Sequence, residues 1–301
     1  MMKAKPGLIG KAVFTIALIV FLCSFSVIIC RLIDSYRSDR LYRSIRNAHD
    51  AYDLMLNREK NEILYDTFFF SPSAQMRDNI QKLLDEGKYE EAEKLAQAQR
   101  IAKEMREAEL RRQKLAIVSS LKRTNGDFVG WISIEDTNVS YPVVQGRDNS
   151  YYLDHDVNRR RSSHGSIFMD FRDDVSDISG PEGCNIVIYG HMMRDGSMFH
   201  DVNLYKDRRF FDEHPIITLE IFPNTYTFRV FSTYVTSPDF DYIQTNFPSK
   251  NEFTGFLNEI KRRSRFSSGA SLNTGDTVLT LSTCGYEFDN ARIAVHAKLI
   301  K

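Results

Sequence analysis

Cysteine, proline and net charge are scarce in this sequence, and each shortage excludes a class of protein. Four cysteines in 301 residues are too few for a disulfide scaffold. Eight prolines and 15 glycines exclude a collagen-like or wholly low-complexity chain. The 40 basic residues balance 40 acidic ones. A chain without net charge is not expected to bind nucleic acid through its overall electrostatic attraction. Because 42% of the residues are hydrophobic, the chain still has ample material for a packed core.

Several common catalytic and cofactor motifs are also absent. The sequence contains no G-x-S-x-G, H-E-x-x-H, C-x-x-C, G-x-G-x-x-G or Walker motif. Zinc, dinucleotide and phosphate-loop chemistry therefore have no support in the sequence. We expect neither a metal nor a cofactor.

One long hydrophobic run is present, near the N-terminus. Ala12 to Cys30 contains no charged residue and lies between Lys11 and Arg31. As a helix this run would measure about 28 Å, close to the hydrocarbon thickness of a bilayer. A cleaved signal peptide is the alternative, because basic residues precede the run, but no small-x-small cleavage site follows it. We expect a short cytoplasmic tail, an uncleaved single-pass membrane anchor and an extracellular remainder, with boundaries at residues 1–11, 12–30 and 31–301.

The segment after this run has the pattern of a charged helix. From Arg77 to Lys114 half of the residues are charged, both signs are interspersed and proline is absent. Acid–base pairs four residues apart occur along it and stabilise helices. Gly87 interrupts the pattern and favours two helices over one. We expect a mainly helical stalk over residues 31–118 that acts as a spacer; a coiled coil that binds a partner is the alternative.

The remaining part, residues 119–301, has the pattern of a mainly β domain. Short apolar or alternating runs are separated by turn residues. One longer helix is expected from Ser249 to Arg263, where Ser249 and Glu252 form a typical helix start. Many short strands with one or two helices favour a β-barrel or a sandwich. The expected strands are Trp131–Ile134, Tyr141–Val144, Ser166–Met169, Asn185–Tyr189, Ile217–Phe222, Thr225–Val235, Thr277–Ser282 and Arg292–Ile300.

Two of these strands lead into residues that can carry out nucleophilic chemistry. Cys284 follows one apolar strand, His191 follows another, and Arg292 opens the final strand eight residues after Cys284. An unperturbed thiol has a pKa of ~8.5 and is mostly protonated at neutral pH. A nearby histidine can transfer protons and an arginine can stabilise an oxyanion, as thiolate acyl transfer requires. On the residues alone, a buried structural cysteine remains the alternative.

The order of these motifs resembles that of class B sortases over roughly residues 120–301. Leu281-Ser282-Thr283-Cys284 with Arg292 is similar to the active-site signature of the family, and Tyr189-Gly190-His191 is similar to the segment with its catalytic histidine. Class B in particular is indicated by the helix at 249–263 and by four segments: 127–132 (DFVGWI), 141–145 (YPVVQ), 148–153 (DNSYYL) and 165–170 (GSIFMD). The predicted stalk is longer than the N-terminal helices expected of that class.

The resemblance implies an eight-stranded sortase-type β-barrel with a few helices and a membrane-anchored cysteine transpeptidase that faces the cell wall. Cys284 would attack the threonine carbonyl of a C-terminal sorting signal similar to Asn-Pro-x-Thr-x. His191 would protonate the leaving amine, and Arg292 would bind the oxyanion or the substrate backbone. An amino group of a cell-wall precursor or of another protein would then resolve the thioester.

The resemblance also implies roles for residues around these three. Ser282, Thr283, Gly285 and Asn149 are candidates for substrate binding, and the Gly285 N–H for the oxyanion. Asp289 is a candidate supporting residue, although a solvated loop carboxylate is the alternative. Cys184 is expected to be structural.

The implied partners are surface proteins with C-terminal sorting signals, the amine acceptor, and the membrane through residues 12–30; nucleic acid is not among them.

Two other functions stay open on the sequence alone. One is a cysteine protease in which water releases the acyl-enzyme. The other is a non-enzymatic anchored binding module with a vestigial site.

Overall fold

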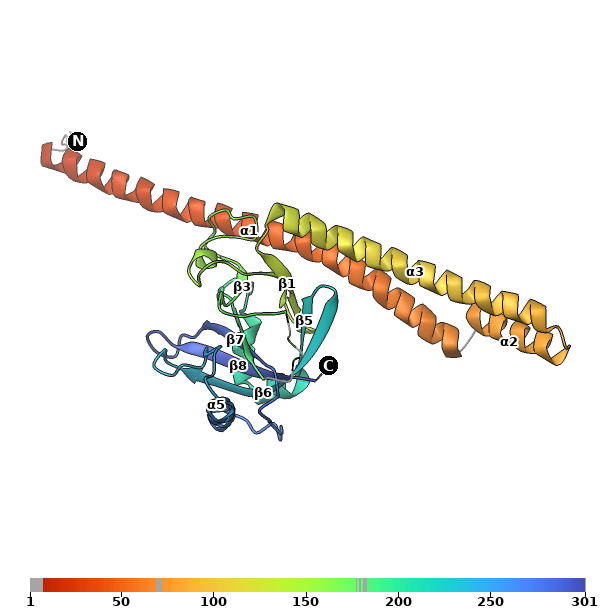
Figure 1. Cartoon of the computed structure of the whole chain (residues 1–301). Coiled ribbons are helices and arrows are strands. Elements are labelled where there is room, and N and C mark those ends of the chain that lie inside the picture. The colour runs from red at the N-terminus through yellow and green to blue at the C-terminus, as the bar shows by residue number, and fades with distance from the viewer. Residues whose placement is uncertain (1–7, 69–71, 177, 179, 181–182, 301) are drawn as a thin grey trace. The chain divides into compact units, whose positions relative to one another are not determined.

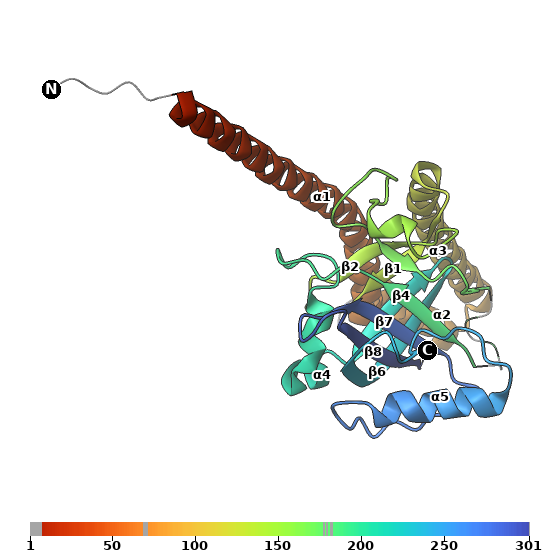
Figure 2. The same ribbon diagram turned by 90° about the vertical axis from the view of Figure 1, so that its left-hand side faces the viewer.

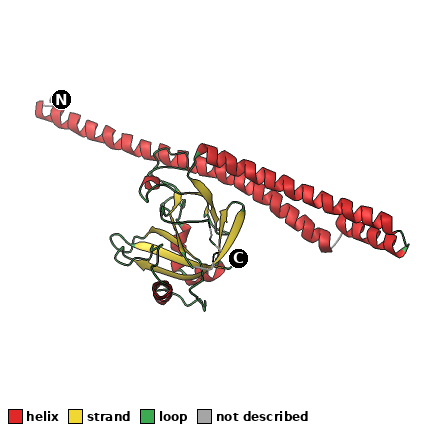
Figure 3. Cartoon of the chain, viewed as in Figure 1, coloured by secondary structure: helices red, strands yellow, loops and turns green. Residues whose placement is uncertain are grey.

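The computed structural model describes residues 8–68, 72–176, 178, 180 and 183–300. Residues 1–7 of the predicted tail lie outside the described residues. The chain divides into two compact units, one made of residues 1–42 and 127–301 and the other of residues 43–126. Figure 1 shows the path of the chain, and Figure 3 shows that the long helices belong to its N-terminal part and the strands to its C-terminal part.

Three helices account for the described part of the chain before residue 125. They are α1 (Leu8–Phe68), α2 (Pro72–Asp85) and α3 (Tyr89–Thr124). Gly87, with φ of +75°, lies in the turn between α2 and α3, where the sequence favoured a break; glycine adopts this left-handed conformation without steric cost. The helices cover the described residues of the predicted stalk, and α3 continues past residue 118 to Thr124. The division into stalk and catalytic domain stays a prediction.

The apolar run predicted as a membrane anchor lies in the first part of α1. By length and composition α1 includes a stretch that could cross a membrane. The side chains described in this run, residues 15–30, are all exposed. An exposed apolar helix surface of this length favours a lipid environment over water.

Residues 128–299 form a closed barrel of eight strands, as the resemblance implied. Around the barrel the order is β1-β2-β3-β4-β7-β8-β6-β5, with β5 paired to β1. The β2–β3 and β4–β7 pairs are parallel and the others are antiparallel. The strands are β1 (Phe128–Ser133), β2 (Ser140–Val144), β3 (Ile167–Met169), β4 (Asn185–Tyr189), β5 (Ile216–Ile221), β6 (Asn224–Thr236), β7 (Val278–Cys284) and β8 (Arg292–Leu299).

One longer helix, α5 (Lys250–Arg262), covers the outside of the barrel beside β6, β7 and β8 (Figure 2). It starts where the sequence predicted, because the Ser249 side chain accepts the Glu252 N–H at 3.2 Å and so caps the first turn. Its apolar face packs on the barrel through four buried side chains, Phe253, Phe256, Leu257 and Ile260. The middle of β7 is consequently buried on both faces, which explains its nearly continuous apolar sequence.

Three short helical segments connect the remaining strands. They are η1 (Tyr151–Leu153), η2 (Asp201–Lys206) and α4 (Arg208–Glu213). Of these, η1 bears directly on the candidate site, because it ends at a residue that contacts His191.

Candidate active site

The register between β4 and β7 brings His191 and Cys284 together. These strands are parallel neighbours in which Tyr189 lies opposite Ser282. His191 and Cys284 each follow this pair by two residues. Parallel strands in register point equivalent side chains to the same side, so the imidazole and the thiol meet at one edge of the barrel.

His191 and Cys284 lie close enough to change each other's proton affinity. Their hydrogen-bonding interaction is the main cause that lowers the pKa of the thiol; the charge of Arg292 lowers it further, while partial burial opposes both. The same interaction is the main cause that raises the pKa of His191, where burial again opposes the shift. Both shifts favour a thiolate beside an imidazolium, which is the reactive form of such a pair.

The second nitrogen of His191 is bound by a backbone carbonyl. Nε2 lies 2.6 Å from the carbonyl oxygen of Leu153, the last residue of η1. Because a carbonyl only accepts, this Nε2 carries a proton, and Nδ1 remains for the thiol. The Asp148 carboxylate fixes the start of η1 by accepting the N–H groups of Ser150 and Tyr151 at 2.7 and 2.8 Å. The ring orientation of His191 therefore depends on the position of η1.

Arg292 faces Cys284 from the other neighbouring strand. In the antiparallel β7–β8 pair these two residues are directly opposite each other. One guanidinium N–H donates to the Ala291 carbonyl at 3.1 Å. A guanidinium has five N–H groups, so such an arginine can also bind a substrate carbonyl or an oxyanion.

Ser282 and Thr283 point in opposite directions. Ser282 shares a face of β7 with Cys284, and its hydroxyl lies 2.9 Å from that of Tyr242. Thr283 alternates to the other face, where it is 3% exposed and its hydroxyl lacks a hydrogen-bond partner among the described residues. The structure therefore brings Ser282 to the site but turns Thr283 away from the thiol.

The remaining predicted neighbours, Gly285, Asp289 and Asn149, lie in three different environments. The Gly285 N–H donates to the Ala291 carbonyl at 2.8 Å, so in this conformation it is not available to an oxyanion. This bond closes the loop between β7 and β8. Asp289 is exposed in the same loop. Asn149 lies in a polar cluster, where its amide donates to the Asp170 carboxylate at 2.8 Å.

Two features of the site escaped the sequence analysis. The first is Tyr242, which bonds Ser282 and lies close enough to Cys284 and Arg292 to interact electrostatically with both. It belongs to the segment between β6 and α5, in which no motif marked it. The second is the Leu153 carbonyl, a backbone group that no residue pattern identifies.

The cluster around Asp170 supports the strand that leads to His191. The Asp170 carboxylate is fully buried and accepts the Tyr189 hydroxyl at 2.7 Å, and Arg172 at 2.8 Å through each oxygen. Arg172 also donates to the Ile243 carbonyl at 3.0 Å, next to Tyr242. The only sequence signal was the position of Asp170 at the end of the 165–170 motif. The cluster ties the end of β4 to the segment that covers Ser282.

Cys184 lies at the opposite end of β4 from His191. It directly precedes the strand, whereas His191 follows its other end. It lines a cavity of about 470 Å³ together with Asp173, Gln244 and other residues. The four cysteines are free thiols, and among the described residues no group of three or more His, Cys, Asp or Glu side chains is placed to hold a metal ion.

Comparisons with known proteins give a consistent result. The sortase domain family model matches residues 132–300. Sortase B of Listeria monocytogenes is 37% identical over 182 residues, which is 60% of this chain and 72% of that protein. A mutant form of Clostridium perfringens sortase B has a solved structure that matches with a TM-score of 0.60 and 38% identity, over 64% of this chain and 91% of that chain. A Staphylococcus aureus sortase B–substrate complex matches with a TM-score of 0.57 and 37% identity, over 62% and 85% of the two chains.

The family match covers more than half of the chain, and the eight-stranded barrel and the order of its motifs agree with it. Relatives and solved structures alike are sortases of one class. The chain belongs to the sortase family of cysteine transpeptidases, in its class B.

Proposed function

We propose that this protein cleaves a sorting signal near the C-terminus of surface proteins and joins the cleaved protein to an amino group. A signal similar to Asn-Pro-x-Thr-x is the proposed substrate sequence. The acceptor is an amine of a cell-wall precursor or of another protein. This proposal rests on one observation: a thiol, an imidazole and a guanidinium lie at the ends of three adjacent strands.

The proposed first step is attack of the Cys284 thiolate on the threonine carbonyl. The carbon–sulfur bond forms, the carbonyl oxygen becomes an oxyanion, and Arg292 donates hydrogen bonds to it. As the peptide bond breaks, the imidazolium of His191 gives its proton to the leaving amine. The product is a thioester between Cys284 and the substrate protein. The mutual pKa shifts of Cys284 and His191 support these roles, because they favour the charged pair that this step consumes.

The proposed second step reverses the first with a different amine. Neutral His191 accepts a proton from the incoming amino group, whose nitrogen attacks the thioester carbonyl. The carbon–sulfur bond breaks, Cys284 leaves as a thiolate, and a new amide links the substrate protein to the acceptor. Water in place of the amine would make the protein a protease.

A peptide assay tests this proposal. A fluorogenic Asn-Pro-x-Thr-x peptide is incubated with the full chain in detergent, with and without an added amine, and the products are identified by mass spectrometry. We expect an amide product in the presence of the amine, no turnover by Cys284→Ala, and a loss of roughly 10²–10⁴-fold in His191→Ala. Cys184→Ser is the matched thiol control and should cleave normally. Turnover by Cys284→Ala at the wild-type rate would disprove the proposal.

We also propose that the first part of α1 anchors the protein in the cell membrane, with residues 31–301 outside. The length of the apolar run and the exposure of its described side chains support an anchor. N-terminal sequencing of the mature protein should then find the run intact. Protease added to intact cells should remove the barrel. A mature protein that begins after residue 30 would contradict the anchor, and a protected barrel would contradict the orientation.

A further inference from the structure

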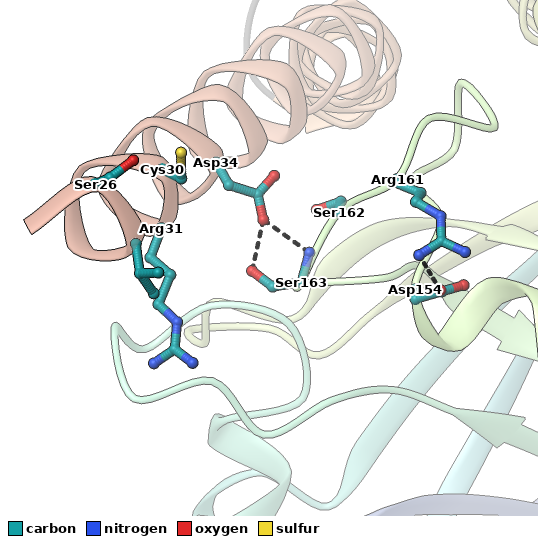
Figure 4. Close-up of a pocket in the computed structure, with 9 residues that line it drawn as sticks. Ser26, Cys30, Arg31, Asp34, Asp154, Arg161, Ser162 and Ser163 are labelled. Atoms are coloured by element: carbon teal, nitrogen blue, oxygen red, sulfur yellow. Dashed lines mark hydrogen bonds and ion pairs between the residues drawn. The ribbon is translucent and has the colours of Figure 1, made fainter. Parts of the chain in front are cut away.

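The part of α1 that follows the apolar run is bonded to the barrel through one polar face. Asp34, Ser38 and Tyr42 are spaced by four residues and so lie on one side of the helix. The Asp34 carboxylate accepts the N–H and the hydroxyl of Ser163 at 2.8 and 2.7 Å (Figure 4). The Ser38 hydroxyl lies 2.7 Å from that of Ser162. We call residues 34–42 the docking segment.

Tyr42 ends the docking segment and reaches toward η1. Its side chain is 5% exposed, and its hydroxyl donates to the Gly165 carbonyl at 2.7 Å. Gly165 has φ of +58° and has no room for a Cβ. Its carbonyl shares a peptide group with the Ser166 N–H, which donates to the Tyr152 carbonyl at 2.9 Å. The next carbonyl of η1, that of Leu153, accepts the His191 Nε2 proton at 2.6 Å. Tyr42 is therefore linked to the catalytic imidazole through this peptide group and the backbone of η1.

A second connection leads from the docking segment to the loop after His191. The Ser35 hydroxyl donates to the Asp195 carboxylate at 3.2 Å, and the buried His164 ring donates to it at 2.9 Å. Partial burial would raise the pKa of Asp195, but its hydrogen bonds outweigh this and hold the pKa well below its usual range. Asp195 therefore stays charged at neutral pH. Ser35 of the docking segment thus contacts a fixed anion four residues after His191.

The loop that receives these contacts is itself strained. Met198 has φ of +57°, a conformation that costs a non-glycine residue free energy and is kept only when its surroundings enforce it. The Met198 N–H donates to the Tyr141 hydroxyl at 2.8 Å, and the Tyr141 ring packs edge-on against Tyr42 at a centroid distance of 5.5 Å. Through Tyr141, Tyr42 therefore also supports the loop that follows His191.

We propose that the docking segment of α1 positions His191, with Tyr42 as its main positioning residue. This inference rests on the proposed function, in which His191 protonates the leaving amine. Catalysis is sensitive to small displacements, since a shift of about 1 Å in a reacting group can cost on the order of 10²-fold in rate. Loss of the Tyr42 hydroxyl would let the Gly165–Ser166 peptide group and the backbone of η1 relax, and with them the imidazole.

The test compares Tyr42→Phe with Tyr36→Phe in the full chain in detergent. Both variants lose one hydroxyl from α1, but Tyr36 is 65% exposed and serves as the matched control. We expect Tyr42→Phe to lower kcat roughly tenfold or more with little change in KM, whereas Tyr36→Phe stays at the wild-type value. Asp195→Asn tests the second connection in the same way and should also lower kcat.

The decisive measurement is the pH dependence of Cys284 alkylation, which needs no substrate. Cys284 is faced by His191, Arg292 and Tyr242, and of these the Tyr42→Phe change displaces only His191. We expect the midpoint of alkylation to move upward, toward that of His191→Ala. A purely structural role would lower the melting temperature without moving this midpoint. Wild-type kcat and midpoint in Tyr42→Phe would overturn the inference, whereas turnover by Cys284→Ala would overturn the proposed function instead.

Discussion

At the scale of single residues, the chemistry depends on two groups that shift each other's pKa in opposite directions. The pKa of Cys284 falls and that of His191 rises because each stabilises the charged form of the other. The thiolate fraction therefore increases at a pH where an isolated thiol is mostly protonated. The positive charge of Arg292 adds to this effect on the thiol.

The pH profile of thiol alkylation measures this coupling. In the wild-type chain the rate should rise through a midpoint below the ordinary value for cysteine. His191→Ala removes the main cause of the lowered pKa, so we expect its midpoint to move upward. Iodoacetamide labelling followed by mass spectrometry of the Cys284 peptide gives the profile. An unchanged midpoint would show that the imidazole does not control the thiol.

Arg292→Lys tests whether charge alone suffices opposite Cys284. A lysine keeps the positive charge but lacks the planar set of donors that a guanidinium offers. We expect kcat for the fluorogenic peptide to fall on the order of 10²–10³-fold, as for the loss of one oxyanion donor, with a melting temperature close to the wild-type value. A fall of less than about threefold would limit the role of Arg292 to its charge.

Residues that carry side-chain chemistry at strand ends could be predicted from the sequence, whereas those that act through contacts could not. Clear strand patterns lie next to Cys284, His191 and Arg292 in the sequence. The register of these strands then brings the three side chains together. Tyr242 meets Ser282 across a separation of 40 residues, and Leu153 contributes a carbonyl to His191 across 38. Such contacts depend on how loops fold over the barrel.

At the scale of elements, the turn after β3 places two carboxylates, Asp170 and Asp173, in a buried and a partly buried position. Asp170 is charged and well paired, but Asp173 is different. Burial, reinforced by the negative charge of Asp170, raises the pKa of Asp173 to about 8, although the Val187 N–H donates to it at 2.7 Å. Asp173 is consequently protonated in the folded protein at neutral pH.

Protonated Asp173 makes the barrel less stable as the pH rises. The folded pKa lies above the unfolded value of about 3.9, so the folded state binds more protons between about pH 4 and 8. The free energy of unfolding should fall through this window by up to about 1.4 kcal/mol per pH unit from this group. Asp173→Asn keeps an acceptor for Val187 and stays neutral. Its gain in melting temperature over the wild type should grow from pH 5 to pH 8, and equal gains at both pH values would contradict the assignment.

The elements themselves were predictable to different degrees. The strands and α5 follow from alternation, apolar runs and the Ser249 cap, which are local signals. A mainly helical stalk was predicted from residue 31, but not that its first part would continue the helix of the apolar run without a break. Sequence patterns reveal a helix by an apolar stripe, but the contacts of this part of α1 with the barrel are made largely by polar groups such as Asp34 and Ser38.

At the scale of the whole molecule, the barrel is closed and has its own buried core, whereas the docking segment adds polar contacts from outside it. A fragment that starts near Ser119 retains every strand. It loses the hydrogen bonds of Ser38 and Tyr42, each worth about 1 kcal/mol.

We expect the fragment 119–301 to melt cooperatively, several degrees below the full chain. Cleavage of the fluorogenic peptide should persist at a reduced rate, because His191 is less well positioned. Differential scanning calorimetry and the peptide assay on the same preparation provide both values. A fragment without a cooperative transition would show that the N-terminal helices are part of the folding unit.

The unbroken helix from Cys30 to Tyr42 determines the distance between the end of the apolar run and the barrel that carries the active site. At 1.5 Å per residue the helix rises about 18 Å between these two positions, and the bonds of Tyr42 and Ser38 leave the barrel little freedom to move along it. In the membrane orientation proposed above, the thiol would be kept within a narrow layer above the lipid headgroups. A substrate tethered to the same membrane would then meet the thiol by a search in two dimensions, and lengthening its tether should slow its capture.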